Sequence, residues 1–115
     1  QLTSAWQSVV KQVNKLSSAG SQSTTIKTTA DKLFLLSEVE IFGSATYSVS
    51  GEGSQYAYYK AGNSKVKNVN GSAINWWERP PHASNTTHFC FVDSNGNANG
   101  NGASNSYGVA FGFCV

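Results

Sequence analysis

Apolar side chains near the start of the chain recur every three to four residues, the spacing of an amphipathic helix with one buried face. Polar and basic residues occupy the opposite face, and residues 17–20 supply a glycine stop signal. We therefore predict an N-terminal helix within residues 1–20 that packs on the core. The same face could instead assemble identical chains, so a homo-oligomer stays open. The apolar positions are Leu2, Trp6, Val9, Val10, Val13 and Leu16.

The middle of the chain alternates short apolar runs with polar loops. Residues 32–36 predict a short buried strand. Ser37 is followed three residues later by Glu40, which matches a capping box and predicts a helical turn that ends at Gly43. Residues 56–59 are rich in tyrosine and fit either a half-buried strand or a short helix.

Aromatic segments enclose a polar tract in the last third of the chain. Residues 89–92 are apolar on both faces and predict a central strand, followed by a hairpin turn at Asn95-Gly96. Residues 109–115 alternate between large apolar side chains and small side chains. We predict that they pair antiparallel with residues 89–92 and bury Phe111.

Two prolines interrupt this aromatic framework at Pro80 and Pro81. Proline cannot donate a backbone hydrogen bond, so an extended turn is predicted there. Glu78 and Arg79 precede the prolines beside a tryptophan pair, and they could form a buried ion pair or belong to a site. We expect the buried ion pair, which would lock the turn. The mixture of short helices and strands, without a repeating strand–helix unit, predicts an α+β fold.

Composition narrows the class of protein. The chain has 115 residues, which fits one domain, and only 12% of them are charged. A net charge of +2 is too small to predict a nucleic-acid partner. There is no apolar run of about eighteen residues, so no membrane insertion is expected. The start lacks a methionine and the regions of a signal peptide, so we expect a processed product or a fragment.

The residue patterns do not predict a metal or cofactor site. Asp93, Asn95 and Asn97 resemble the start of a calcium loop. However, Ala98 and Ser104 stand where such a loop needs its glycine and its bidentate glutamate.

No catalytic arrangement is predicted either. No carboxylate follows His82 or His88 at a spacing that would orient the ring, so we interpret both as polar contact residues. Cys90 and Cys114 lie in apolar runs and could be buried free thiols or one disulfide. We therefore assign no catalytic residue and expect a non-enzymatic domain.

Several short motifs resemble a family of uncharacterised domains from gut bacteria and their phages. The family has a Trp-Trp/Leu-x-Arg-Ser-Pro motif, matched here by residues 76–81 with Pro80 in place of Ser. A Leu-Leu-Ser-Glu segment at residues 35–38 and a closing Gly-Val strand from Gly108 also match, so the likeness covers residues 31–115. The family is similar to the variable proteins of diversity-generating retroelements.

That resemblance implies a single C-type-lectin-like domain over residues 1–115, of the formylglycine-generating-enzyme type. Its N-terminal helix would pack on a small mixed or antiparallel sheet with long loops. It also implies a variable region at residues 76–115, diversified by mutagenesis of adenines in Asn codons. The side chains expected to hold this backbone are Trp76, Trp77, Arg79, Phe89, Phe111 and Phe113.

The expected function is that of a hypervariable ligand-binding domain, used for phage receptor binding or bacterial surface adhesion. Its location would be a phage virion or a bacterial cell surface, and its partner a protein or glycan on a cell surface. Exposed Tyr, His and Asn are also the residue types of antibody binding loops. The expected contact positions are His82, Thr86, Thr87, His88, Phe91, Asp93, Asn99, Asn101 and Tyr107. All of these except Thr87 and Phe91 are expected to share one exposed face.

Three alternatives remain open at this point. A lectin of fixed specificity would use Trp76 or Trp77 as a sugar platform, although the signatures of calcium-dependent lectins are absent. An enzyme related to the formylglycine-generating fold would need an exposed, reactive cysteine. A structural virion subunit would use the predicted N-terminal helix as an oligomer interface.

Overall fold

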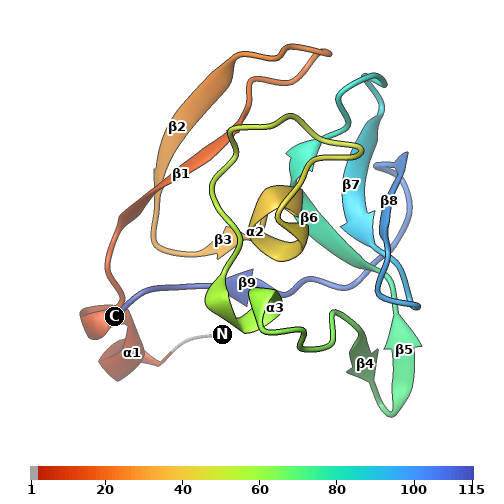
Figure 1. Cartoon of the computed structure of the whole chain (residues 1–115). Helices are drawn as coiled ribbons and strands as arrows, with labels where there is room; N and C mark the ends of the chain where they lie inside the picture. The colour runs from red at the N-terminus through yellow and green to blue at the C-terminus, as the bar shows by residue number, and fades with distance from the viewer. Residues whose placement is uncertain (1–2) are drawn as a thin grey trace.

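The computed structural model describes residues 3–115, and this part of the chain is built mainly from β-strands in four small antiparallel sheets (Figure 1). Three short helices accompany the strands. The predicted α+β fold with an N-terminal helix packed on a sheet is therefore wrong. In chain order the elements are α1 (Ser4–Val9), β1 (Val13–Ser18), β2 (Ile26–Asp31), β3 (Phe34–Leu35), α2 (Glu38–Phe42), α3 (Ala57–Lys60), β4 (Lys67–Val69), β5 (Ser72–Ile74), β6 (Trp76–Pro81), β7 (His88–Val92), β8 (Ala98–Gly102) and β9 (Phe111–Gly112).

The N-terminal helix is much shorter than predicted. It ends at Val9, and none of its residues is buried. Val10 already has extended backbone angles, and β1 then pairs with β2 over six residue pairs. The helical spacing predicted too long a helix because it assigned the basic residues to the solvent-facing side. One of them, Lys15, is only 8% exposed. Leu2 lies outside the described residues.

A three-stranded sheet with the order β6-β7-β8 carries the core and the site. The predicted central strand is confirmed, since β7 lies between the other two. The hairpin at Asn95-Gly96 is also confirmed: Gly96 has a φ of 84° and donates its N–H to Asp93 O. The prolines do not end the pairing, because β6 continues through Pro81 with a register shift after Trp77.

The C-terminal strand does not pair with β7 as predicted. Both edges of β7 are occupied by β6 and β8, so β9 pairs with β3 in a separate sheet. Phe111 is 47% exposed and Phe113 is 37% exposed, so neither is a core residue. The backbone N–H of Lys11 donates to Cys114 O at 2.7 Å, which joins the two ends of the described chain.

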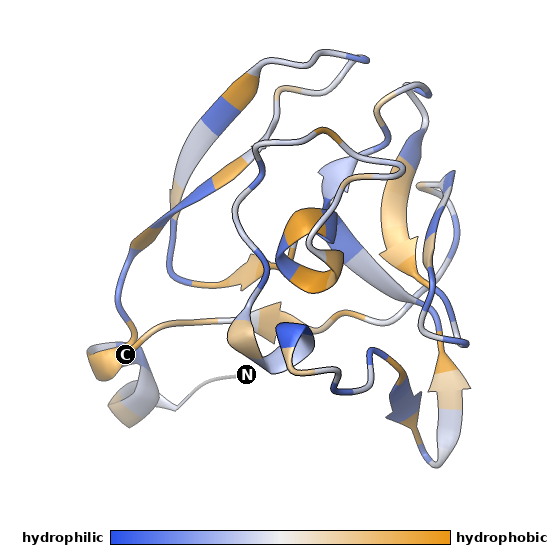
Figure 2. Ribbon diagram, viewed as in Figure 1, coloured by the Kyte–Doolittle hydropathy of each residue, from blue (hydrophilic) through white to orange (hydrophobic). Residues whose placement is uncertain are grey.

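The two faces of the β6-β7-β8 sheet have different roles. The inner face packs Trp76 and Val92, each 0% exposed, with Ile41 of α2 and Tyr59 of α3. Figure 2 shows the hydrophobic colouring of α2 and of β7. The predicted capping box of α2 is present, and Gly43 ends this helix in the left-handed conformation. The tyrosine segment that the sequence left undecided forms the short helix α3.

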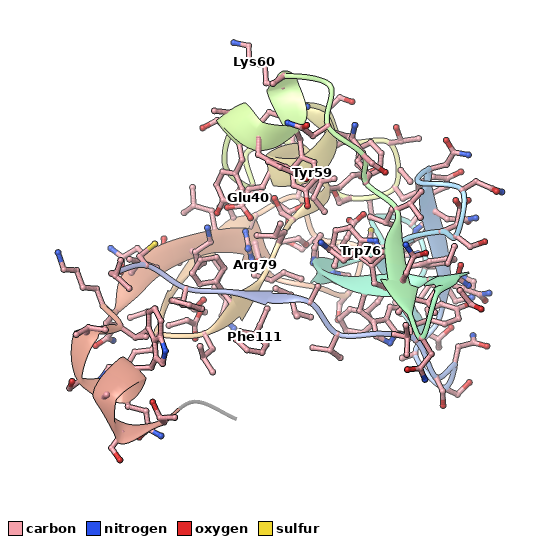
Figure 3. The ribbon with its side chains drawn as sticks, turned by 90° about the horizontal axis from the view of Figure 1, so that it is seen from below. Glu40, Tyr59, Lys60, Trp76, Arg79 and Phe111 are labelled. Carbon is pink, nitrogen blue, oxygen red and sulfur yellow. The ribbon has the colours of Figure 1, made fainter. Side chains whose placement is uncertain are left out.

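A buried polar network ties β1, α2 and β6 together. Glu40 accepts hydrogen bonds from Lys15 and, at 2.9 Å, from Arg79, as Figure 3 shows for the two labelled side chains. Burial alone would raise the pKa of Glu40, but these cations and the Ser37 N–H outweigh it and lower the pKa. The predicted Glu78–Arg79 ion pair is wrong, because Arg79 pairs with Glu40 instead.

Candidate ligand-binding site

The outer face of the β6-β7-β8 sheet carries an aromatic cluster. Trp77, Phe91 and Asn99 lie opposite one another across the three strands. Tyr107 lies over them, with its ring 4.6 Å from both the Trp77 and the Phe91 ring centroids. Phe91 is only 3% exposed beneath this ring. It therefore supports the outer face from below and cannot serve as the contact position that we predicted.

A hollow of about 230 Å³ opens beside this cluster. Phe89, which lies opposite Asn101, is 39% exposed at the hollow, so it is a surface residue and not the buried scaffold residue that we predicted. Trp77 is half-buried and forms part of the wall. The lining residues are Leu35, Trp77, Glu78, Arg79, Phe89 and Ala103.

Two asparagines of β8 and Tyr107 form the polar rim of the outer face. The side-chain oxygens of Asn99 and Asn101 accept hydrogen bonds from the next residues' backbone N–H groups, on Gly100 and Gly102, at 2.9 and 2.8 Å. The Asn101 Nδ2 donates to the Tyr107 hydroxyl at 3.2 Å. These hydrogen bonds join residues that are close in the sequence. They hold the Asn99 and Asn101 side chains in place but do not connect them to a distant part of the fold.

The two histidines lie away from this rim. His88 pairs with Gly102 and is adjacent to Phe89 on β7. Successive side chains of a strand point to opposite faces, so His88 points to the inner side of the sheet. The His82 ring is 5.9 Å from the His88 ring and covers Gly100, where an added Cβ would lie 2.4 Å from the ring. The prediction that the two histidines share one exposed face with this rim is therefore wrong.

The remaining predicted contact positions lie in turns. Thr86 and Thr87 are exposed, and Thr87 donates from both its N–H and its hydroxyl to Asn85 Oδ1. The Asp93 carboxylate accepts the N–H groups of Asn95 and Asn97, so it organises the hairpin turn. Residues 3–115 hold no group of three or more His, Cys, Asp or Glu side chains that could bind a metal.

The two cysteines lie in different surroundings, and both are free thiols. Cys90 is buried, whereas Cys114 is exposed, which corrects the expectation that both are buried. Burial, with a further contribution from the charges of Glu78, Glu38 and Glu52, raises the pKa of the Cys90 thiol. A raised pKa disfavours the reactive thiolate, so Cys90 is poorly suited to nucleophilic chemistry.

Buried carboxylates lie beneath the inner face. Glu38 accepts the backbone N–H and the hydroxyl of Ser48, and Glu52 accepts the Ser18 N–H at 2.7 Å. Glu78 is only 2% exposed, and neither of its oxygens has a hydrogen-bond partner among the described residues. Burial, reinforced by the charges of Glu38 and Glu52, raises the pKa of Glu78 to about 9.

Fold and site together define a small domain of mainly antiparallel β-structure with an open aromatic hollow on its central sheet. The chain belongs to the family described as "Domain of unknown function (DUF6273)", whose model matches residues 1–115. No curated protein and no solved structure gives a match. Within residues 3–115, no helix is long and apolar enough to cross a membrane.

Sequence reasoning found only part of this surface. Of the expected contact positions, Asn99, Asn101 and Tyr107 lie together on the outer face. Trp77, which lines the hollow, was named in the sequence analysis as a possible sugar platform. Sequence reasoning missed Leu35 and Ala103, because the elements that carry them meet at the hollow only through tertiary pairing.

Proposed function

We propose that the protein is a non-enzymatic ligand-binding domain whose contact surface is the outer face of the β6-β7-β8 sheet. The observation that carries the proposal is an aromatic wall, formed by the exposed Phe89 and the half-buried Trp77, next to asparagines that make only local hydrogen bonds. Ligand sites typically combine an apolar concave surface with a few placed polar groups. Natural partners would be proteins or glycans on a cell surface, reached from a phage virion or a bacterial surface.

Variation of this surface is the second part of the proposal. Asn101 and Ala103 are exposed, Asn99 is half-buried, and none of the three belongs to the buried cluster around Trp76 and Ile41. Exposed substitutions usually change stability by less than about 0.5 kcal/mol. This division between a fixed inner face and a replaceable outer rim supports the hypervariable role that the resemblance implies. A reverse transcriptase gene beside a near-identical template repeat would support it independently.

A display library tests the proposal directly. We would randomise Asn99, Asn101 and Ala103 together and select against a panel of unrelated purified proteins and glycans. Most members should remain folded, and binders with new specificities should be enriched, because affinity would come from a few side chains on this face.

The matched control library randomises three exposed positions of the β1–β2 hairpin, Asn14, Thr28 and Ala30. It should remain equally folded and give no comparable enrichment. Equal enrichment from both libraries, or widespread unfolding of the outer-face library, would contradict the proposal.

A further inference from the structure

The hollow on the outer face offers no charged group to a ligand. Arg79 lines it, but its guanidinium makes five hydrogen bonds, to Ser17, Leu35, Glu40, Leu16 and Glu52. A guanidinium has five N–H groups, so none remains free. The oxygens of Glu78 are buried below the surface. The ligand that fits this hollow is therefore uncharged.

The rim of the outer face presents hydrogen-bond donors in fixed positions. The side-chain oxygens of Asn99 and Asn101 already accept hydrogen bonds from neighbouring backbone N–H groups. The side-chain groups left to contact a ligand are therefore their amide nitrogens, which are donors. The Tyr107 hydroxyl accepts from Asn101, so its own proton can be donated. Groups that are already held in place lose little conformational entropy on binding.

Aromatic walls beside fixed polar donors suit a ligand that has an apolar face and hydroxyl groups at its edge. A pyranose ring has this character, because its C–H face can lie on an aromatic ring while its hydroxyls bond to amides. The hollow, at about 230 Å³, is smaller than sites for drug-sized ligands, so it accepts one ring rather than a chain. We propose, on the basis of the ligand-binding function above, that the hollow binds a neutral sugar residue against Phe89 and Trp77.

Two other modes of sugar recognition do not fit this site. Trp76 is 0% exposed, so it cannot be a sugar platform. The described residues hold no cluster of metal ligands, so sugar binding here does not depend on calcium and persists in a chelator. A single-ring site is weak when it acts alone, and binding becomes measurable when several domains act together.

The test displays the intact chain multivalently on streptavidin and probes an array of glycans. The array carries neutral glycans ending in glucose, galactose, mannose, N-acetylglucosamine or N-acetylgalactosamine, with sialylated versions of the same structures. We expect binding to a subset of the neutral glycans, unchanged by EDTA. Phe89→Ala should weaken it about tenfold, and Phe89→Tyr should retain it, because the ring provides the contact.

Tyr58→Ala is the matched control, since Tyr58 is an aromatic residue with 60% exposure on α3. It should leave glycan binding unchanged, and melting curves confirm that each variant is folded. Preference for sialylated glycans, or glycan binding unaffected by Phe89→Ala, overturns the sugar assignment. If the array shows no glycan binding while the outer-face library yields binders of proteins, the sugar assignment is overturned but the proposed function remains. Failure of that library removes the proposed function itself.

Discussion

Replacing Glu78 with glutamine removes the one buried carboxylate that lacks a hydrogen-bond partner among the described residues. Burial raises its pKa from 4.5 to about 9 in the folded protein. The folded protein therefore holds a proton that the unfolded chain releases between these two pH values. As a result, the free energy of unfolding contributed by this group is highest below pH 4.5 and falls as the pH rises toward 9.

The size of the effect follows from the pKa difference. Between the unfolded and folded pKa values of Glu78, each pH unit lowers the free energy of unfolding by about 1.4 kcal/mol. The wild-type protein should therefore lose at most about 4 kcal/mol of this free energy between pH 5 and pH 8. Glu52, whose pKa is also raised by burial, acts in the same direction. The lowered pKa of Glu40 acts at more acidic pH, where stability is lost as the pH falls.

Urea unfolding followed by tryptophan fluorescence at pH 5, 6, 7 and 8 measures this dependence. Glu78→Gln should lose most of the pH slope and should gain stability over the wild type toward pH 8, because an amide cannot ionise. Asp31→Asn, on strand β2, is the control and should keep the wild-type slope. A Glu78→Gln protein whose slope equals that of the wild type would refute the assignment of a buried, protonated carboxyl group.

Three further predictions address the scaffold. Arg79→Lys should destabilise the protein by about 2–4 kcal/mol in urea unfolding, because an ammonium group cannot replace the five guanidinium hydrogen bonds; a loss under about 1 kcal/mol would show that the network matters little. Trp76→Ala should lower the free energy of unfolding by about 3–5 kcal/mol in the same assay. Phe111→Ala should lower it by less than about 1 kcal/mol, because the Phe111 ring is exposed. Equal losses would contradict the different burial of the two rings. In the native protein a thiol reagent should modify Cys114 rapidly and Cys90 only on unfolding, so equal rates for both thiols would contradict their different exposure.

Local signals in the sequence predicted local structure well. The capping box at Ser37 and the Asn95-Gly96 turn each depend on a few adjacent residues, and both occur as predicted. The N-terminal helix was wrong because Lys15 buries its ammonium group against Glu40, a partner from a distant segment. Helical periodicity assumes that a lysine faces solvent, and a buried ion pair violates that assumption.

Long-range pairing explains the other errors. The partner of the C-terminal strand is β3, which lies far away in the sequence, and no local pattern identifies it. For the site, the sequence supplied the residue types but not the strand register. A one-residue step separates His88 from Phe89 and places their side chains on opposite faces of β7.

The asparagines of β8 have a consequence for self-association. At the two ends of the β7–β8 ladder, Asp93 N–H donates to Asn97 O and Ala103 N–H donates to Thr87 O. In an antiparallel ladder, every second residue of a strand points its N–H toward the partner strand. The N–H groups of Gly100 and Gly102 therefore point away from β7. These donors lie on a free sheet edge, where they could recruit a strand from another molecule. The side-chain oxygens of Asn99 and Asn101 occupy both of them. An Asp at either position keeps the acceptor oxygen in the same place and preserves this protection, whereas an aliphatic or aromatic residue leaves the edge donor unpaired.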